Sequence, residues 1–381
     1  MRVSVDTNRL RPALAALASV SGHRETLPIL AGVLFEASES SLKLTSQNLS
    51  VGLEWTLPVS VDGAGQSVIP LRPLFDLARR LESDTLEIDA SDSAQVRLSW
   101  KQGEAVLNAM SPDEFPRPAF AQDPGVRVSA GEFRRGVEHV AFAAGYDPGQ
   151  PVLEGIRVRF GTDAIEFLAT DRSRVARSNR PVQGGVAVDS AVVFPASALV
   201  TLGRLSGQTD AYDIAWDSHG VTIRWEGTRF YSRLLDGTFP EVDRLIPEDY
   251  PIQAVASRQS LVGACERVSS LMDSGTNQIF LTLADDRLSL RGESAGNRAE
   301  ESVVARRVGE DLEMSFNTRL LLDALAHLEG EDVVLEMRGA EELMRMRPVD
   351  RRDQYVVVLP MMRSRPSNSK PRSSRWGPTI V

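Results

Sequence analysis

The chain repeats one order of short motifs three times, and this repetition limits the possible folds more than any other feature of the sequence. The segment PILAGV at 28–33 resembles PVLEGI at 151–156, and the pair FP at 115–116 returns at 239–240. The pairs Ile69-Pro70, Phe194-Pro195 and Phe316-Asn317 each precede a stretch with leucine at every third or fourth position. These landmarks recur about every 122 to 125 residues. The sequence therefore predicts three like modules in tandem, of which the third has diverged most.

Two segments of linker composition separate the copies. AQDPG at 121–125 and PEDYP at 247–251 combine proline with acidic residues. We therefore expect domains at 1–122, 123–250 and 251–362, followed by a basic tail at 363–381. The tail is rich in serine, proline and arginine, a composition that predicts disorder in isolation.

Each copy has the same predicted order of elements: a short strand, a helix, several alternating strands, a second helix and closing strands. The first helix of copy one places Leu10, Leu14 and Leu17 on one face. In copy two, Ser129 and Glu132 form a capping box before the first helix. In copy three the apolar stripe comprises Leu261, Cys265, Val268 and Leu271. This plan predicts an α+β fold in which two helices pack on antiparallel sheet.

Single residue types exclude several classes of protein. Cys265 is the only cysteine, so a disulfide framework or a cysteine-based metal site within one chain is excluded. The four histidines lack metal-ligand spacing, and no nucleophile, phosphate-loop or dinucleotide motif is present. We expect no metal, no cofactor and no catalytic site. No apolar run approaches a membrane span and the N-terminus has no signal segment, so a cytoplasmic location is the simplest interpretation.

The charge distribution points to a local basic surface on an acidic molecule. The formal net charge is -9, which by itself argues against a protein coated in nucleic acid. Opposite their apolar stripes, however, the predicted helices carry arginines such as Arg11, Arg72, Arg134 and Arg319. For any one of them a solvated helix face is the simpler interpretation. The recurrence in three copies favours contact with nucleic-acid phosphates without base reading.

Four motifs, in this order and spacing, resemble the bacterial DNA polymerase III β subunit family, the β sliding clamps. They are LPILxG at 27–32, ATDxxR at 169–174, FPxxxRxxP at 239–247 and VVLPM at 357–361. The likeness runs in register from Met1 to about Met362. The motifs are individually short, but their order makes the resemblance specific.

The resemblance implies three DNA-clamp domains per chain that close into a ring as a head-to-tail homodimer. It implies sequence-independent binding of duplex DNA in the bore, nucleoid association in the cytoplasm and no enzyme activity. The arginines expected to face DNA are Arg24, Arg72, Arg79, Arg80, Arg134, Arg135, Arg204, Arg267 and Arg319. Leu107, Leu271 and Met272 are expected at the dimer interface, with a core position as an equally good interpretation.

The resemblance also implies a groove between the second and third domains that binds short linear peptides of DNA polymerase subunits, the clamp loader and repair proteins. Apolar walls accept apolar peptide side chains, while a few polar groups fix the peptide's orientation. The expected lining is Leu153, Thr170, Arg172, Ser173, Arg174, Val175, Pro240, Arg244, Leu245, Leu320, Val357, Leu359, Pro360 and Met361. Arg174 and Arg244 are expected to shape the wall or hold backbone carbonyls, with an ordinary salt bridge as the alternative.

Two departures from the family pattern affect this groove. The family often has Gly-His where this chain has Arg172-Ser173, so we expect a more cationic rim. Family members usually end soon after the Pro-Met pair, whereas this chain continues to Val381. We hypothesise that the tail folds into the groove and competes with client peptides. A free tail is the simpler alternative.

Three other functions stay open at this point. A paralogous clamp with an altered groove, serving repair or inhibitor resistance, would share every motif above. A hydrolase or transferase on another repeat fold predicts a pocket with convergent titratable groups, which the sequence does not contain. A structural assembly protein would never meet DNA.

Overall fold

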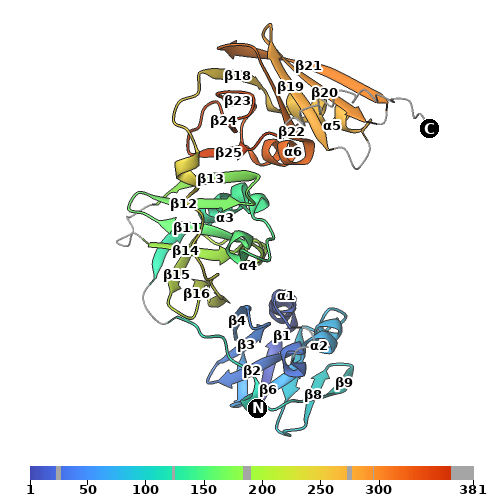
Figure 1. Ribbon diagram of the computed structural model, residues 1–381. Helices are drawn as coiled ribbons and strands as arrows, with labels where there is room; N and C mark the ends of the chain where they lie inside the picture. Colours follow the sequence, from blue (N-terminus) through green and yellow to red (C-terminus); the bar gives the residue numbers. More distant parts are fainter. Residues whose placement is uncertain (23–26, 122–124, 183–189, 273–276, 295, 362–381) are drawn as a thin grey trace, which may run out of the picture. The chain divides into compact units, whose positions relative to one another are not determined.

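The computed structural model describes residues 1–22, 27–121, 125–182, 190–272, 277–294 and 296–361, which form two compact units (Figure 1). Unit 1 comprises Met1–Leu245 together with Arg351–Val356. Unit 2 comprises Ile246–Asp350 and the chain from Val357 onward. Unit 1 contains the first two sequence copies and unit 2 most of the third.

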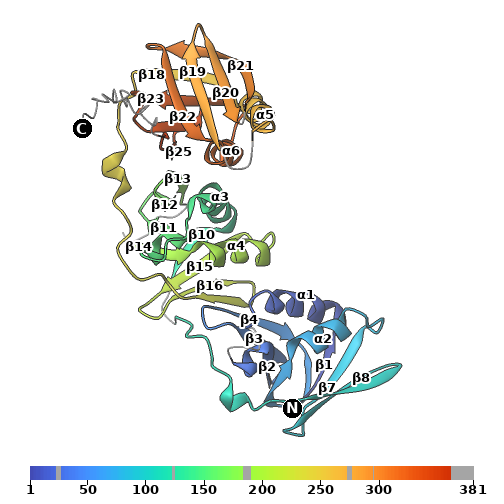
Figure 2. The same ribbon diagram turned by 45° about the vertical axis from the view of Figure 1, so that its right-hand side comes forward.

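The first copy packs two helices, α1 (Thr7–Ala18) and α2 (Leu71–Ala78), side by side against antiparallel sheet (Figures 1 and 2). One sheet has the order β5-β1-β7-β8-β9, and β6-β2-β3-β4 belong to a second sheet. The strands are β1 (Arg2–Asp6), β2 (Gly32–Ser38), β3 (Ser41–Gln47), β4 (Val51–Pro58), β5 (Ser60–Gly63), β6 (Gly65–Pro70), β7 (Thr85–Asp89), β8 (Gln95–Trp100) and β9 (Gly103–Asn108).

The second copy repeats this plan with α3 (Ala130–Val140) and α4 (Ala196–Leu205). Its strands are β10 (Val126–Ser129), β11 (Gly155–Phe160), β12 (Ala164–Thr170), β13 (Arg174–Pro181), β14 (Ser190–Pro195), β15 (Ala211–Trp216), β16 (Val221–Trp225) and β17 (Thr228–Ser232). The last of these, β17, pairs antiparallel with β4, so copies one and two share an eight-stranded sheet. A short 3₁₀ turn, η5 (Val242–Leu245), ends this copy.

The third copy contains α5 (Arg258–Ser269) and α6 (Thr318–His327). Its strands are β18 (Ile252–Ser257), β19 (Gln278–Ala284), β20 (Arg287–Ser294), β21 (Asn297–Val308), β22 (Leu312–Asn317), β23 (Asp332–Met337), β24 (Met344–Pro348) and β25 (Gln354–Val358). Within unit 2 the strand order is β24-β23-β18-β21-β20-β19-β22. The first residues of β25 lie in unit 1, beside β13. The prediction of an α+β fold built from three like modules, each with two helices on antiparallel sheet, is confirmed.

The first helix of each copy begins directly after a strand, at a residue that caps it. The caps are Asp6, which accepts a hydrogen bond from Asn8 N at 2.8 Å, Ser129 for α3 and Ser257 for α5. Such side chains satisfy backbone N–H groups that have no partner within the helix. The predicted cap at Ser129 is confirmed, since its hydroxyl accepts from Glu132 N.

The predicted apolar stripes form the cores, with one exception. Leu10, Leu14 and Leu17 are fully buried, as are Leu261 and Cys265. The expectation for Leu271 is wrong, because α5 ends at Ser269 and Leu271 is 56% exposed. Arg11 also differs from expectation: its Nε donates to Ala78 O at 2.8 Å and its Nη2 to Leu81 O. It satisfies carbonyls at the end of α2 and is not a free surface charge.

Candidate functional site

The part of the expected peptide groove that lies in unit 1 is built on the segment 239–245, which covers one face of the sheet β11-β12-β13. Phe239 and Val242 are buried in a small cluster with Val152 and Leu168. Val175 of β13 packs against this cluster. The structure thus brings the predicted Val175 to the segment that carries the predicted Pro240, Arg244 and Leu245. Sequence reasoning missed Val242, whose only signal is its position three residues after Phe239.

The outer side chains of this segment are left in solvent. Leu245 is 73% exposed, the largest value of any leucine in the described residues, and Pro240 is half-buried. The Arg244 side chain is 82% exposed and pairs with Glu241 at 3.0 Å. Leu153 lies below the surface at 1% exposure, so it supports this surface and does not line it. Leu245 thus places an apolar side chain in solvent beside the segment's buried cluster.

Hydrogen bonds between side chains and backbone fix the loop 170–174, which carries four of the predicted groove residues. Thr170 Oγ1 donates to Arg174 O at 2.7 Å and accepts from Arg172 N at 3.1 Å. Asp171 Oδ1 accepts from the backbone N–H of both Ser173 and Arg174 at 3.0 Å. Arg172 adopts a positive φ of 71°, which this turn requires. The loop is a rigid element formed by its own polar side chains.

The two loop arginines have local partners. Arg174 is 10% exposed, pairs with Asp171 at 2.9 Å and lies over the ring of Phe142 at 5.0 Å. Of the two interpretations given for Arg174, the structure shows the ordinary salt bridge, which joins two residues of the loop. Arg172 pairs with Asp147, so part of the extra positive charge expected at the rim is offset.

The predicted groove residues in unit 2 lie at the end of β25. Val357 is buried, whereas Leu359 and Met361 are 46% and 40% exposed and Pro360 is half-buried. Met361 N donates to Ser315 O at 2.7 Å, and Ser315 Oγ donates to Met361 O at 2.9 Å. Leu320 of α6 is half-buried. This end of the chain is therefore tied to β22 up to Met361; the tail lies outside the described residues.

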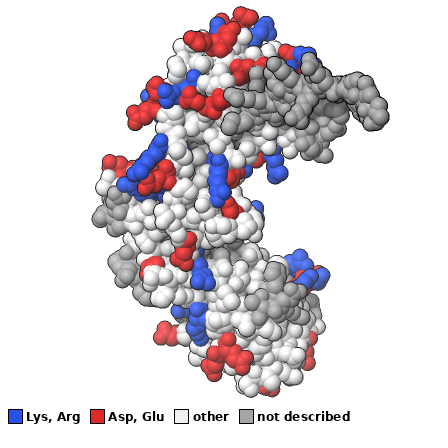
Figure 3. All heavy atoms as spheres, in the orientation of Figure 1, with Lys and Arg blue, Asp and Glu red and all other residues white. Residues whose placement is uncertain are grey.

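The arginines expected to face DNA fall into two groups. Four of them are exposed but pair with acids of their own module: Arg79 and Arg80 with Asp76, Arg135 with Glu132 and Arg267 with Glu301. Three are exposed and have no ion pair among the described residues, namely Arg72 of α2, Arg204 of α4 and Arg319 of α6. On the face drawn in Figure 3, basic side chains stand in small groups, several beside acidic ones.

Two predicted arginines do not fit either group. Arg134 is half-buried beside a cavity of about 220 Å³ between α3 and α4, and its Nη1 has no hydrogen-bond partner among the described residues. Arg24 lies outside the described residues.

Two of the strand edges that lack a partner among the described residues bear on the dimer interface. β9 ends the sheet β5-β1-β7-β8-β9, and residues 297–304 of β21 pair with β20 alone. Val106 on β9 is 48% exposed and Val304 on β21 is 73% exposed. Of the three predicted interface residues, Leu107 is half-buried on β9, Leu271 is exposed and Met272 packs against Gly292. Neither valine is among the residues that the sequence predicted for the interface.

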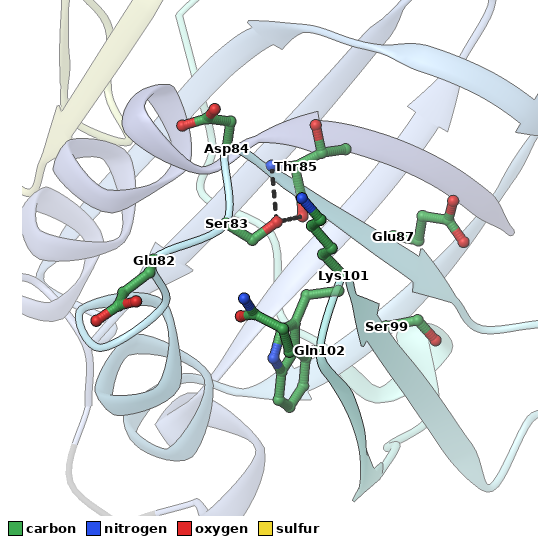
Figure 4. Close-up of a pocket in the computed structure, with 9 residues that line it drawn as sticks. Glu82, Ser83, Asp84, Thr85, Glu87, Ser99, Lys101 and Gln102 are labelled. Atoms are coloured by element: carbon green, nitrogen blue, oxygen red, sulfur yellow. Dashed lines mark hydrogen bonds between the residues drawn. The ribbon is translucent and has the colours of Figure 1, made fainter.

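Copy one contains a cavity that the sequence did not predict. A cavity of about 610 Å³ in copy one is lined by residues 82–85, 87 and 99–102, which include neither histidine nor cysteine (Figure 4). Its Ser83 hydroxyl donates to Thr85 O at 2.9 Å. Cys265 is buried, and burial raises the pKa of its thiol to about 12. Within the described ranges, no cluster of three potential metal ligands occurs and no helix is long and apolar enough to cross a membrane.

The architecture therefore defines a class: proteins of three like α+β modules, of which the first two share one sheet. Comparison with known proteins gives the family. Models of the N-terminal, central and C-terminal domains of the DNA polymerase III beta subunit match residues 1–119, 127–241 and 243–362. The chain belongs to the DNA polymerase III β subunit family.

Relatives and solved structures agree with this assignment. A beta sliding clamp of Synechococcus elongatus is 28% identical over 371 residues, covering 95% of this chain and 99% of the relative. A beta sliding clamp of Staphylococcus aureus is 28% identical over 351 residues, covering 89% and 93%. The sliding clamp of Pseudomonas aeruginosa bound to griselimycin superposes with a TM-score of 0.89 at 25% identity, covering 95% of this chain and 99% of that one. The Bacillus subtilis clamp, 23% identical, has the same fold with a TM-score of 0.91.

Proposed function

We propose that this protein is a DNA sliding clamp, a processivity factor that closes as a head-to-tail homodimer around duplex DNA and tethers polymerases by short peptides. It is an accessory subunit without a catalytic site of its own, and it acts on DNA in the cytoplasm. Its partners are polymerase subunits, the clamp loader and repair proteins.

One observation carries the ring. The last strand of copy two, β17, pairs with β4 of copy one, and β25 of copy three lies beside β13 of copy two. In each case the last strand of one copy meets the third strand after the first helix of the preceding copy. Two such strands are left without this pairing: β9, the last strand of copy one, and β21, the third strand after the first helix of copy three. A second chain offers the matching edge to each, so two chains pair both of these edges and the contact closes.

The oligomeric state tests this closure. Light scattering coupled to size-exclusion chromatography is expected to show a dimer for the wild type. Val106→Asp and Val304→Asp should each give a monomer, because an unpaired charge at the centre of an interface disfavours association. Val349→Asp, at an apolar residue that is 36% exposed and belongs to neither β9 nor β21, is the matched control and should stay dimeric. A wild type that is monomeric at micromolar concentration would contradict the ring.

DNA encirclement is tested by topology. The protein is loaded on nicked circular DNA by a clamp loader, and the circle is then cut. A ring stays on the circle and slides off the linear form, whereas electrostatic binding alone survives the cut and falls with salt. Arg72→Gln, Arg204→Gln and Arg319→Gln combined should reduce the salt dependence of DNA binding, by about 0.9 in slope for each phosphate that is no longer neutralised. The matched triple variant at Arg79, Arg135 and Arg267, whose charges are paired, should change it less. Retention on linear DNA would contradict the clamp.

The peptide surface is tested with griselimycin, the compound bound in the clamp of Pseudomonas aeruginosa. The exposed Leu245 next to the cluster of Val152, Leu168 and Val242 supports apolar recognition by this segment. Calorimetry should show binding by the wild type and a loss of at least about tenfold for Leu245→Ser. Leu49→Ser changes an exposed leucine of copy one and should bind normally. Equal affinity of all three proteins would show that this segment is not the site.

A further inference from the structure

Four charged side chains form one ion-pair network beneath the segment 239–245. Arg157 of β11 pairs with Glu166 of β12 at 2.7 Å and reaches Asp243 of η5 at 3.5 Å. Arg177 of β13 pairs with the same Glu166 and with Asp243 at 3.1 Å. Each arginine therefore bridges the two carboxylates, of which Glu166 lies on the sheet and Asp243 on the segment.

Three side chains of the network are mostly buried, and the fourth, Asp243, is half exposed. The side chains of Glu166, Arg157 and Arg177 are 12%, 17% and 27% exposed, whereas Asp243 is 48% exposed. Leu168 separates the two arginines on the sheet, since it pairs with Arg157 on one side and Arg177 on the other. The charges thus surround the buried leucine that anchors Val242 and Phe239.

Further contacts fasten the same segment and the returning chain. The Arg157 guanidinium lies over the ring of Phe239 at 5.7 Å. Arg177 donates to the hydroxyl of Tyr355 at 3.4 Å and lies 6.0 Å from its ring. Burial alone would lower the pKa of Arg177, but the hydrogen bond to Tyr355 and the two carboxylates raise it, so the charge is secure. One arginine thereby touches both stretches at which the chain leaves unit 1, near Leu245 and Val356.

This arrangement is poorly suited to adding stability. Removing two guanidinium groups from water is unfavourable, and the Nε atoms of Arg157 and Arg177 are buried without a hydrogen-bond partner among the described residues. Apolar side chains at these positions would extend the cluster at lower cost. What charges provide, and apolar contacts do not, is a fixed direction and register for the segment.

We infer that Arg157 and Arg177 are positioning residues for peptide binding: through Asp243 they fix η5, so that Leu245 and Arg244 are presented in one conformation. The inference rests on the proposed peptide surface, but neither arginine needs to touch the peptide. A preformed site loses less conformational entropy when it binds, so the network acts on affinity and not on the fold.

Asp243→Asn tests the inference because it releases the segment while leaving both arginines paired with Glu166. Griselimycin affinity is expected to fall about five- to tenfold, with the thermal midpoint unchanged within about 1 °C, since the pair is half exposed. Asp243→Glu should recover most of the affinity. Asp213→Asn, which removes an exposed carboxylate paired with Arg127 at 3.4 Å, is the matched control and should bind normally.

A double-mutant cycle separates positioning from direct contact. If Asp243 acts through the arginines, Asp243→Asn should cause little further loss when added to Arg157→Met with Arg177→Met. Additive losses would mean that Asp243 touches the ligand, and unchanged affinity of Asp243→Asn would mean that the network does not position the surface. Either result overturns the inference while the clamp stands. Failure of the wild type itself to bind would instead count against the proposed peptide surface.

Discussion

Replacing Gly136 with alanine should destabilise the second copy, although alanine ordinarily favours a helix over glycine. Gly136 lies inside α3, and a Cβ built on it would stand 2.3 Å from a ring carbon of Phe167. Gly203 on the neighbouring α4 has room, because the nearest atoms to its Cβ are side-chain carbons of Arg134 at 3.9 Å. The two substitutions make a matched pair within one module.

The magnitudes follow from two opposing terms. Helix propensity favours alanine by about 1 kcal/mol at both sites. Carbon atoms rest about 3.5–4.0 Å apart, so the new methyl at 136 overlaps the Phe167 ring by more than about 1 Å. Phe167 is fully buried and packs edge-on against Phe133 with centroids 5.1 Å apart, so it cannot shift alone. Overpacking costs about 1–3 kcal/mol, and a ring held this firmly places Gly136→Ala in the upper part of that range, at about 2–3 kcal/mol. After the propensity gain of about 1 kcal/mol, we expect a net loss of about 1–2 kcal/mol for Gly136→Ala and a gain of up to about 1 kcal/mol for Gly203→Ala.

Urea unfolding followed by circular dichroism measures both variants, as shifts of the transition midpoint in opposite directions. The sign is the test, since the propensity term is common to both sites. A midpoint for Gly136→Ala equal to or above that of the wild type would refute the reasoning, because it would mean that the Phe167 ring moves aside freely and that this core is loosely packed.

Three further predictions concern single contacts. Arg229 binds Glu54 at 2.6 and 2.7 Å where copies one and two meet, and the Glu54 side chain is 9% exposed. Arg229→Met should reduce the free energy of unfolding by about 2–3 kcal/mol, because it leaves this carboxylate unpaired. Adding Glu54→Gln should recover part of the loss in the same urea assay. The Cys265 thiol should resist iodoacetamide at pH 8 in the folded protein and react with it in urea. Because the pKa of this thiol is about 12 in the folded protein and ordinarily 9.0, its contribution to the free energy of unfolding is complete below pH 9 and is lost as the pH rises toward 12. Hydrogen bonds from Ser91 and then from Arg2 lower the pKa of Asp89 to about 2. The contribution of Asp89 to the free energy of unfolding is therefore complete above pH 3.8, its ordinary pKa, and is lost as the pH falls toward 2. Ser91→Ala should raise the pKa of Asp89 in an NMR titration, and an unchanged value would contradict this cause.

The sequence predicted the plan of each module because that plan depends on local patterns. Leucines three and four residues apart placed α1 correctly, and a serine three residues before a glutamate placed the start of α3. Where the local pattern misled, a tertiary contact was the reason. Arg11 sits on the polar face of α1, but its guanidinium reaches the end of α2, a contact that depends on how the two helices pack. Leu271 continues the apolar spacing of α5 beyond the residue at which the helix stops.

The candidate site was only partly accessible from the sequence for the same reason. Pro240, Arg244 and Leu245 stand in a motif and could be named directly. The residues that hold them are far away in the chain: Arg157, Glu166 and Arg177 lie on three strands and meet only because of the register of β11, β12 and β13. No periodicity in one sequence encodes that register together with the position of η5.

The division among the helix arginines bears on how such a protein would hold DNA. Arg79 and Arg80 share the carboxylate of Asp76, and Arg135 and Arg267 each pair with an acid of their own module. This leaves Arg72, Arg204 and Arg319 as the described members of the predicted set that are exposed and unpaired. A dimer would offer only twice that number, on an acidic molecule of net charge -9 per chain. Because each phosphate contact adds a modest, salt-sensitive increment, so small a set predicts weak attraction along the duplex. Weak attraction permits sliding, and long residence must then come from the closed ring. Disrupting the ring, as Val304→Asp should do at both seams, should therefore shorten residence on circular DNA far more than removing all three arginines. The reverse order would show that charge and not topology retains the protein.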